Sequence, residues 1–356
     1  MNYFKNRIEK LNHYLNQSNY DGMYVSNITN VRYMSGFTGS SGFLLFINDE
    51  KHFFSDGRYT EQAKNQVSDF QIHITSNHFK EIQNMGILKK GMNIAFEADH
   101  LSVSTFENLK NNFDVNLEST SSIIENIAAV KDENEINCLK TAIEITDLAF
   151  DLIIPELKVG VTEKEIAAKL AYIFKTNGAE GESYDSIIGS GANGALPHAT
   201  PSDKKFESGD FVVMDFGALY GGYHADMTRT VVINEKTSKH DEIYNLVLKS
   251  QLAGIDRAAA GVKCSEVDKS CRDVIKDAGY GEFFMHGTGH GIGLEVHTLP
   301  RVSWVNHEAL ITNNVITIEP GIYLADWGGV RIEDDCQILD NGCLPLNKST
   351  KELLVL

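Results

Sequence analysis

The feature that most constrains the fold is a stretch in which two apolar, strand-like runs flank a turn. It reads FVVMDFGALYGGYHADMTRTVV and covers Phe211–Val232. If the chain folds back about Tyr220–Gly222, Asp215 and Asp226 fall nearly opposite each other. Directly opposed side chains of a hairpin have Cβ atoms roughly 4.5–5.5 Å apart. Two carboxylates at that separation repel each other or share a proton unless a cation lies between them.

A second stretch of the same kind lies downstream and reads VITIEPGIYLADWGGVRIEDD. Glu319 and Glu333 are symmetric about Asp326, so a second hairpin would present a second pair of opposed acids. One such pair has an ordinary explanation, such as an exposed strand edge or an acid beside a turn. Two pairs embedded in apolar strands indicate a metal site, because buried carboxylates need compensating charge.

Three histidines separated by glycines lie between these two stretches. The segment MHGTGHGIGLEVH contains His286, His290 and His297. Alone, such a loop can be merely structural, but beside four acids it predicts a nitrogen ligand and acid–base groups. Four carboxylates and one imidazole form an oxygen-rich shell that suits manganese and also accommodates cobalt or zinc. The sequence contains no CxxC pair of the kind that binds structural zinc. It also contains no DxDxDG-type loop of the kind that binds calcium.

The length and patterning of the chain predict two domains. The chain has 356 residues, which is more than one core usually organises. Strand-like and helix-like segments alternate in the first third, which predicts an α/β domain over residues 1–127. Residues 128–356 combine long helices with the strands described above, which predicts an α+β domain.

Two helices of the second domain have clear end signals in the sequence. Thr162 and Glu165 form a capping-box pattern, and Gly178 is placed where a helix would end. Ser265 and Gly279 bracket a further helix in the same way.

Charge and composition disfavour several classes of partner. The formal net charge of −17 argues against nucleic acid or an anionic membrane. No apolar run approaches the ~20 residues that a membrane helix requires. The N-terminal residues have no apolar core or cleavage site typical of a signal peptide, and the cysteines are odd in number. We therefore expect a cytoplasmic protein with reduced thiols.

Five ordered motifs resemble those of the metallopeptidases with the pita-bread fold, namely MDFG, ADMTRT, HGTGHGIG, TIEPG and RIED. This group includes methionine aminopeptidase, aminopeptidase P and prolidase. The segments GFTGS (Gly36–Ser40) and DGRY (Asp56–Tyr59) resemble the creatinase-like N-terminal domain of the proline-directed members, which methionine aminopeptidases lack. The resemblance covers essentially the whole chain. It implies an α/β N-terminal domain, an α+β pita-bread catalytic domain and a homodimer.

The resemblance also implies a set of ligands for two divalent metal ions, with manganese preferred and cobalt or zinc as alternatives. In this sequence the ligands are Asp215, Asp226, His290, Glu319 and Glu333. Asp215 would bind one metal, and His290 and Glu319 would complete the site of the other. Asp226 and Glu333 would bridge the two ions.

Further residues take roles in catalysis by the same resemblance. His198, in GALPHATPS, corresponds to a histidine that contacts substrate and assists proton movement at the reacting carbonyl. His297 corresponds to one that hydrogen-bonds that carbonyl or the tetrahedral intermediate, and Glu319 would relay a proton to the leaving nitrogen. Groups around the pocket would be His286, Tyr323 and Arg331.

Ordinary roles are also open to these residues. Without the resemblance, His198 could be a solvated loop residue and Tyr323 a core residue. Arg331 could serve only to pair with an acid.

The implied reaction is hydrolysis of the bond that precedes proline in proline-containing peptides. GFTGS followed by DGRY in so short a chain favours an Xaa-Pro aminopeptidase, and an Xaa-Pro dipeptidase (prolidase) is the alternative. Metal-free creatine hydrolysis and a non-catalytic peptide-binding module are remote alternatives, because all five ligands are present. Two departures from the family pattern are Thr298, where relatives often carry an acid, and Tyr184, where many carry phenylalanine.

Overall fold

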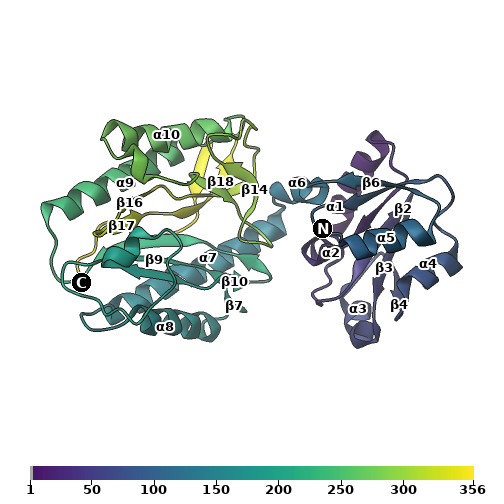
Figure 1. Ribbon diagram of the computed structural model, residues 1–356, viewed down its shortest axis with the longest axis horizontal. Coiled ribbons are helices and arrows are strands. Elements are labelled where there is room, and N and C mark those ends of the chain that lie inside the picture. The colour runs from purple at the N-terminus through teal and green to yellow at the C-terminus, as the bar shows by residue number, and fades with distance from the viewer. Residues whose placement is uncertain (1–2) are drawn as a thin grey trace. The chain divides into compact units, whose positions relative to one another are not determined.

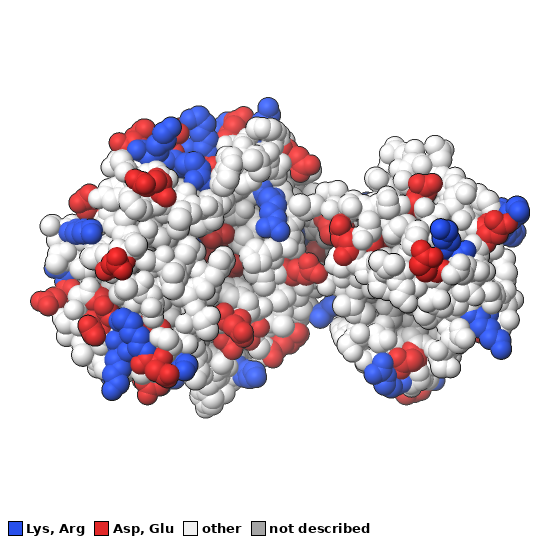
Figure 2. Space-filling view, viewed as in Figure 1, with Lys and Arg blue, Asp and Glu red and all other residues white. Residues whose placement is uncertain are grey.

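The structure is a computed structural model that describes residues 3–356. The chain divides into two compact units, Met1–Ala128 and Ala129–Leu356 (Figure 1). Among the described residues, none of the helices combines the length and the apolar character needed to cross a membrane. Acidic and basic side chains are interspersed over the face shown in Figure 2, so the acidic excess is not gathered in one patch there.

The first unit is built on a six-stranded mixed sheet with strand order β4-β3-β2-β1-β5-β6. Its strands are β1 (Gly22–Val25), β2 (Phe43–Ile47), β3 (Glu50–Ser55), β4 (Gln71–Ile74), β5 (Asn93–Glu97) and β6 (Asn116–Thr120). Its helices are α1 (Tyr3–Gln17), α2 (Ile28–Ser35), α3 (Thr60–Gln66), α4 (His78–Met85) and α5 (Val103–Asn112). The central strands β1 and β2 are buried along their whole length, which explains their continuous apolar runs. The predicted α/β fold of this part is confirmed.

The second unit contains two pairs of long helices with strands between them. These helices are α7 (Glu133–Ile153), α8 (Glu163–Thr176), α9 (Ser238–Arg257) and α10 (Cys264–Asp277), and the shorter α6 (Ile123–Ala129) precedes them. Figure 1 shows α7 and α8 on one side of the strands and α9 and α10 on the other. Each pair buries apolar side chains against its own strands, which creates two hydrophobic cores. The predicted α+β class is confirmed.

The strands of this unit are antiparallel throughout. One sheet contains β8 (Ile187–Ser190), β9 (Phe211–Phe216) and β12 (Met227–Val232), and a larger one contains β13 (Gly289–Gly291), β14 (Thr298–Val302), β15 (Val315–Ile318), β18 (Asp334–Leu339) and β19 (Gly342–Pro345). A small sheet contains β7 (Gly181–Glu182), β10 (Ala218–Tyr220) and β11 (Tyr223–His224), and β16 (Gly321–Leu324) pairs with β17 (Gly328–Arg331).

The first predicted hairpin forms, but its register differs from the prediction by two residues. Asp215 pairs with Thr228, and the tight turn joins Tyr220 to Tyr223. The turn residues Gly221 and Gly222 both have positive φ, of 60° and 79°. A two-residue turn of this kind needs positive φ at both central positions, which glycine adopts readily. Asp226 is therefore a diagonal neighbour of Asp215 and not its direct partner.

The second predicted hairpin forms in the predicted register. Ile318 pairs with Asp334, and Gly321 pairs with Arg331, so Glu319 and Glu333 lie at matching positions of the two strands. The two ladders belong to different sheets, because the pairing is interrupted at Glu319–Pro320 and at the residues opposite. Proline has no N–H to donate to a ladder, which accounts for an interruption at this point.

The helix-end signals are partly confirmed. The Thr162–Glu165 capping box starts α8, and Gly178, with φ of 96°, follows its end. The prediction that Ser265 begins α10 is wrong, because Lys263 is the N-cap and Ser265 lies inside the first turn. The N–H groups of Cys264 and Ser265 donate to backbone carbonyls of residues 308 and 306. These N–H groups have no acceptor inside the helix, and backbone carbonyls outside it accept their hydrogen bonds in place of a side-chain cap. The sequence therefore contains no cap residue that marks the start of α10.

Candidate active site

One cavity of the second unit collects nearly all the residues that the sequence singled out. Its volume is about 560 Å³. The five predicted ligands line it, together with His198, His286, His297 and Arg331. Tyr323 is not among the lining residues, but its hydroxyl lies 2.9 Å from His286 Nε2 and accepts a 2.7 Å hydrogen bond from Arg331 Nη1.

The acids reach the cavity from strand ends and from a point where strand pairing is interrupted. Asp215 is in β9, and Asp226 lies immediately before β12. Glu319 and Glu333 lie at the interruption between the sheet of β15 and β18 and the ribbon of β16 and β17. Asp226 and Glu333 are buried, with exposed fractions of 5% and 1%.

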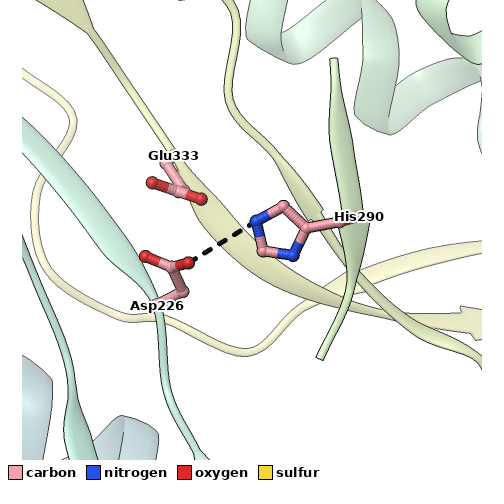
Figure 3. Close-up of side chains that lie close together, drawn as sticks. All are labelled: Asp226, His290 and Glu333. Atoms are coloured by element: carbon pink, nitrogen blue, oxygen red, sulfur yellow. Dashed lines mark ion pairs between the residues drawn. The ribbon is translucent and has the colours of Figure 1, made fainter. Parts of the chain in front are cut away.

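Carboxylates and an imidazole converge at the centre of this cavity. His290 Nε2 lies 3.7 Å from Asp226 Oδ2 and 3.3 Å from Glu319 Oε1. One potential ligand atom from each of Asp226, His290 and Glu333 lies within 4.8 Å of the others. In Figure 3 these three side chains come from separate segments and point toward one another. The geometry is that of a candidate metal centre.

Burial makes this concentration of acids electrostatically unfavourable. Burial, followed by repulsion from neighbouring carboxylates, raises the pKa of Asp226 and of Glu333 well above the usual values. Burial also raises the pKa of Glu319 to about 8, although Arg331 opposes that increase. A cation bound among these groups would favour their ionised form.

The His290 ring is neutral, and its Nε2 faces the acids, as in a nitrogen ligand. Burial is the main cause that lowers its pKa to about 4, so the ring is neutral at pH 7. Its Nδ1 lies 3.1 Å from the carbonyl oxygen of Gly291, which assigns the proton to Nδ1 and leaves the Nε2 lone pair facing the acids. A neutral ring with an oriented lone pair is the form in which histidine binds metals.

Threonine and arginine side chains hold the acids in place. Thr228 Oγ1 donates to Glu333 Oε2 at 2.6 Å and accepts from Arg331 Nε at 3.0 Å. Arg331 Nη2 lies 2.5 Å from Asp215 Oδ2. These bonds connect three strands around the cavity and fix the rotamers of two acids. Thr317 plays the same part for Glu319, donating to its Oε1 at 3.2 Å.

Sequence reasoning missed these supporting threonines and understated Tyr184. The Tyr184 hydroxyl lies within hydrogen-bonding distance of both Asp215 and Asp226 and can donate its proton to either, whereas the sequence marked this residue only as a departure from the family pattern. Thr317 could have been found, because a residue two positions before Glu319 in a strand projects from the same face. Thr228 carries no comparable signal, because threonine is common in any strand.

The two histidines with predicted catalytic roles lie on the open side of the cavity. His198 and His297 are both exposed and line its wall. The His297 ring centroid is 4.3 Å from that of His290. Burial and the charge of Arg301 lower the pKa of His297 below its usual value. A neutral His297 can donate one hydrogen bond to a ligand in the cavity.

The donor set fits a divalent cation. Glu333 Oε1 is buried and has no hydrogen-bond partner among the described residues. A buried oxygen of this kind is destabilising unless some group compensates it. Carboxylate oxygens combined with one imidazole nitrogen are suitable ligands for manganese, cobalt or zinc.

Comparison with known proteins finds relatives over the whole chain. The model for metallopeptidase family M24 matches residues 137–340, and the model for the creatinase/prolidase N-terminal domain matches residues 7–130. An Xaa-Pro dipeptidase of Pyrococcus furiosus is 39% identical over 98% of this chain and 100% of its own length.

Two solved structures are also similar over nearly the whole chain. An Xaa-Pro dipeptidase from Bacillus anthracis has a TM-score of 0.95 and 38% identity, covering 99% of this chain and 100% of that one. An X-Pro aminopeptidase from Thermotoga maritima has a TM-score of 0.87 and 39% identity, covering 95% and 98%.

Proposed function

Because the chain belongs to metallopeptidase family M24 and carries a creatinase/prolidase N-terminal domain, we propose that it is an Xaa-Pro dipeptidase, which hydrolyses the bond preceding proline in dipeptides. Relatives named Xaa-Pro dipeptidase match it over their full length. The sequence motifs favoured an Xaa-Pro aminopeptidase, and the similarity to the Thermotoga maritima enzyme keeps that activity as the second candidate. The relatives favour the dipeptidase.

The five predicted ligands would hold two divalent metal ions, and manganese is the preferred metal. These ligands are Asp215, Asp226, His290, Glu319 and Glu333. Three observations support this assignment: Glu333 Oε1 has no hydrogen-bond partner within residues 3–356, His290 Nε2 faces the acids, and the pKa of Glu333 is raised. Divalent ions held there supply Lewis acidity and lower the pKa of a water toward neutrality. Arg331, Thr228 and Tyr184 orient the acids around them.

Three side chains of the cavity would handle the substrate and its protons. The leaving nitrogen is that of proline, which has no N–H in the peptide and, like any amide nitrogen, must gain a proton as the bond breaks. Glu319 would take a proton from the attacking water and deliver it to that nitrogen. His297 would donate a hydrogen bond to the carbonyl oxygen, where negative charge develops, and His198 would contact the substrate from the loop that carries it.

The observation that carries this proposal is the convergence of Asp226, His290 and Glu333 inside the cavity of a chain from this family. The test is hydrolysis of Ala-Pro and Ala-Pro-Ala after chelation and after addition of Mn²⁺, with Ala-Ala-Ala as control. We expect Mn²⁺-dependent cleavage of Ala-Pro. Preferential cleavage of Ala-Pro-Ala would establish the aminopeptidase instead, and no metal-dependent cleavage of either peptide would reject both.

A further inference from the structure

Two histidines of the first unit have ring nitrogens that lie close together on neighbouring strands. His52 is in β3, and His73 is in β4, the edge strand of the sheet. The distance from His52 Nδ1 to His73 Nε2 is 3.1 Å. In the parallel register Phe54 pairs with His73, so all three side chains project from the same face of the sheet. This pair belongs to a different unit from the candidate active site.

Glu50 determines which nitrogen of His52 carries the proton. Its Oε2 lies 3.2 Å from His52 Nε2, and an ionised carboxylate can only accept, so the proton of the neutral ring is on Nε2. The lone pair of His52 Nδ1 therefore faces His73. A carboxylate that accepts from the far nitrogen of the ring is the usual partner of a metal-bound histidine, because it fixes the tautomer and the ring orientation.

Packing holds both rings in place and keeps them neutral. His52 is fully buried, and the His73 ring stacks on that of Phe54 with centroids 4.6 Å apart. Burial is the main cause that lowers the pKa of both histidines, so both rings are neutral at pH 7. The charge of Glu81, in α4, opposes this shift at His73 and so favours a positive charge there. Neutral imidazole is the form of histidine that binds metals.

The distance between the two nitrogens fits a pair of ligands on one metal ion. Imidazole nitrogens bind zinc at about 2.0–2.1 Å, so two of them lie about 2.9 Å apart at a right angle and about 3.3 Å apart at the tetrahedral angle. The observed 3.1 Å is between these values. Without a metal, His73 Nε2 donates a hydrogen bond to His52 Nδ1. A metal ion takes the place of this shared proton, and His73 then carries its proton on Nδ1.

We propose that His52 and His73 form a binding site for a divalent transition-metal ion that prefers nitrogen, namely zinc, nickel or copper. Imidazole suits these ions, whereas Mn²⁺ is at the weak end of the affinity order. Within residues 3–356 no further histidine, cysteine or carboxylate joins these two nitrogens in a cluster, so water would fill the remaining positions. The site would therefore select against the metal preferred by the oxygen-rich acid cluster. The inference is independent of the proposed peptidase function.

Equilibrium dialysis against Zn²⁺ compares the wild type with His73→Phe, which keeps a ring on Phe54 but has no ligand nitrogen. Both proteins contain the complete acid cluster, so the Zn²⁺ bound there cancels in the difference. We expect the wild type to bind one more Zn²⁺ per chain at micromolar free Zn²⁺. His13→Phe is the matched control, because it removes an exposed histidine of α1 in the same unit, and it should bind as many ions as the wild type.

Three outcomes of the dialysis would overturn the inference. Equal binding by the wild type and His73→Phe would show that the pair holds no ion. An equal loss in His13→Phe would show unspecific binding to histidines of this unit. A difference that appears only at millimolar Zn²⁺ would show adventitious binding.

Glu50→Ala tests the site without changing a ligand. More than half of the Glu50 side chain is exposed, so its removal should leave the fold intact. Loss of the carboxylate that orients His52 should weaken Zn²⁺ binding at this site about 10–100-fold. An unchanged affinity would contradict the ligand role of His52.

Hydrogen exchange followed by mass spectrometry tests where the ion binds. A metal held by both rings would join the edge strand β4 to β3, and local opening of such a strand becomes rarer when it is held. Zn²⁺ should therefore slow exchange in β3 and β4 of the wild type but not of His73→Phe, and Mn²⁺ should slow it in neither protein. Equal slowing by Zn²⁺ in both proteins, or slowing in neither, would reject the site.

Discussion

Two buried carboxylates, one lining the cavity and one outside its lining, have a hydrogen-bond partner on only one of their oxygens. Glu333 accepts a hydrogen bond at Oε2 from Thr228, while its buried Oε1 has no partner within residues 3–356. Asp335, which the sequence did not single out, is similar: its Oδ2 accepts the N–H of Asp226, and its buried Oδ1 has no such partner. The protein thus orients these two acids through one oxygen each and leaves the other oxygen without a partner within residues 3–356.

The Thr228 hydroxyl should tune metal affinity without making a ligand bond. Thr228→Val keeps the shape of the side chain but removes the bonds to Glu333 and Arg331. Removing such a supporting contact typically costs about 10–100-fold in metal affinity. We expect a loss of that size in a Mn²⁺ titration followed by calorimetry.

Thr230→Val is the control for this substitution. Thr230 lies in the same strand and is equally buried, but its hydroxyl donates to the Arg331 carbonyl oxygen and contacts no acid. It should lower stability and leave Mn²⁺ affinity nearly unchanged. Equal losses in the two variants would show that strand stability, and not the orientation of Glu333, controls affinity.

The acid cluster should make the stability of the metal-free protein fall as pH rises. Burial raises the pKa of Glu319 to about 8 in the folded chain, whereas an unfolded glutamate titrates near 4.5. Between pH 4.5 and 8 the folded state holds a proton on Glu319 that the unfolded state has lost. The contribution of this protonated carboxyl to stability is therefore fully present below pH 4.5 and is lost as pH rises toward 8. Glu333 shifts in the same direction.

Urea denaturation of chelated protein at pH 5.5 and 8 tests this expectation. The free energy of unfolding should be lower at pH 8, and saturating Mn²⁺ should reduce the difference, because metal binding replaces the protons. Glu319→Gln should also reduce the pH dependence of the chelated protein. A stability that rises from pH 5.5 to 8 in chelated protein would contradict the raised pKa values.

At the scale of elements, the two acidic hairpins show what a sequence pattern can and cannot determine. The register of the second hairpin was predictable because Glu319 and Glu333 are symmetric about one clear turn. The predicted register of the first hairpin differed from the observed one by two residues. The segment around Gly221 and Gly222 allows turns at adjacent positions, and only the φ angles distinguish them. Apolar alternation predicts that a strand exists, and turn geometry decides which residues face each other.

The assignment of ligands depended on the family resemblance more than on spacing. Strand spacing alone brought the acids together in pairs, but nothing in it placed His290 nearer to them than His286 or His297. The structure separates these histidines, since His290 faces the acids while His286 contacts Tyr323. That distinction arises from the pairing of β13 with β15, a long-range contact that local sequence does not encode.

The loop that carries His198 is anchored at both ends by one buried acid of α8. Glu163 Oε1 accepts from Ser190 N and Oγ at 2.8 Å, and its Oε2 accepts from Ser202 N at 2.9 Å and Oγ at 2.6 Å. Although burial opposes it, these bonds lower the pKa of Glu163 below its usual value. Its position in the first turn of the helix also favours negative charge.

Glu163→Gln should therefore impair His198 from a distance. The amide keeps the size of the side chain but presents a donor to serine N–H groups, so one end of the loop loses its acceptor. We expect kcat for Ala-Pro to fall about tenfold, because small displacements of a catalytic group, the role proposed for His198, are costly, while Mn²⁺ affinity stays the same.

Glu165→Gln is the control for this change, because Glu165 caps the same helix turn and is exposed. It should lower the melting temperature slightly and leave kcat unchanged. A Glu163→Gln variant with normal kcat would show that the His198 loop does not need this anchor.

For the whole molecule, the fold class and the family were within reach of sequence reasoning, but the substrate length was not. Five motifs in order specify the second unit, and GFTGS with DGRY specify the first. The motifs favoured an aminopeptidase, whereas full-length relatives favour a dipeptidase. The motifs consist of ligands and turns that both activities share, so they say little about the groups that recognise the far end of a peptide.

Metal binding should stabilise the second unit selectively, because all the predicted ligands lie within it. A ligand that binds only the folded state at 100 times its Kd stabilises that state by about 2.7 kcal/mol, which slows exchange through global unfolding about a hundredfold. We expect Mn²⁺ to slow hydrogen exchange in β9, β12, β15 and β18 by up to this factor. Exchange in β1, β2 and β5 of the first unit should change little.

Hydrogen exchange followed by mass spectrometry, on the full chain with chelator and with excess Mn²⁺, measures both units in one experiment. Glu333→Gln is the control, since it removes a proposed bridging ligand while keeping the shape of the side chain. In that variant, protection in β15 and β18 should respond weakly to Mn²⁺. Equal slowing in both units of the wild type would mean that they unfold together. Slowing confined to the first unit would place the metal away from the acid cluster.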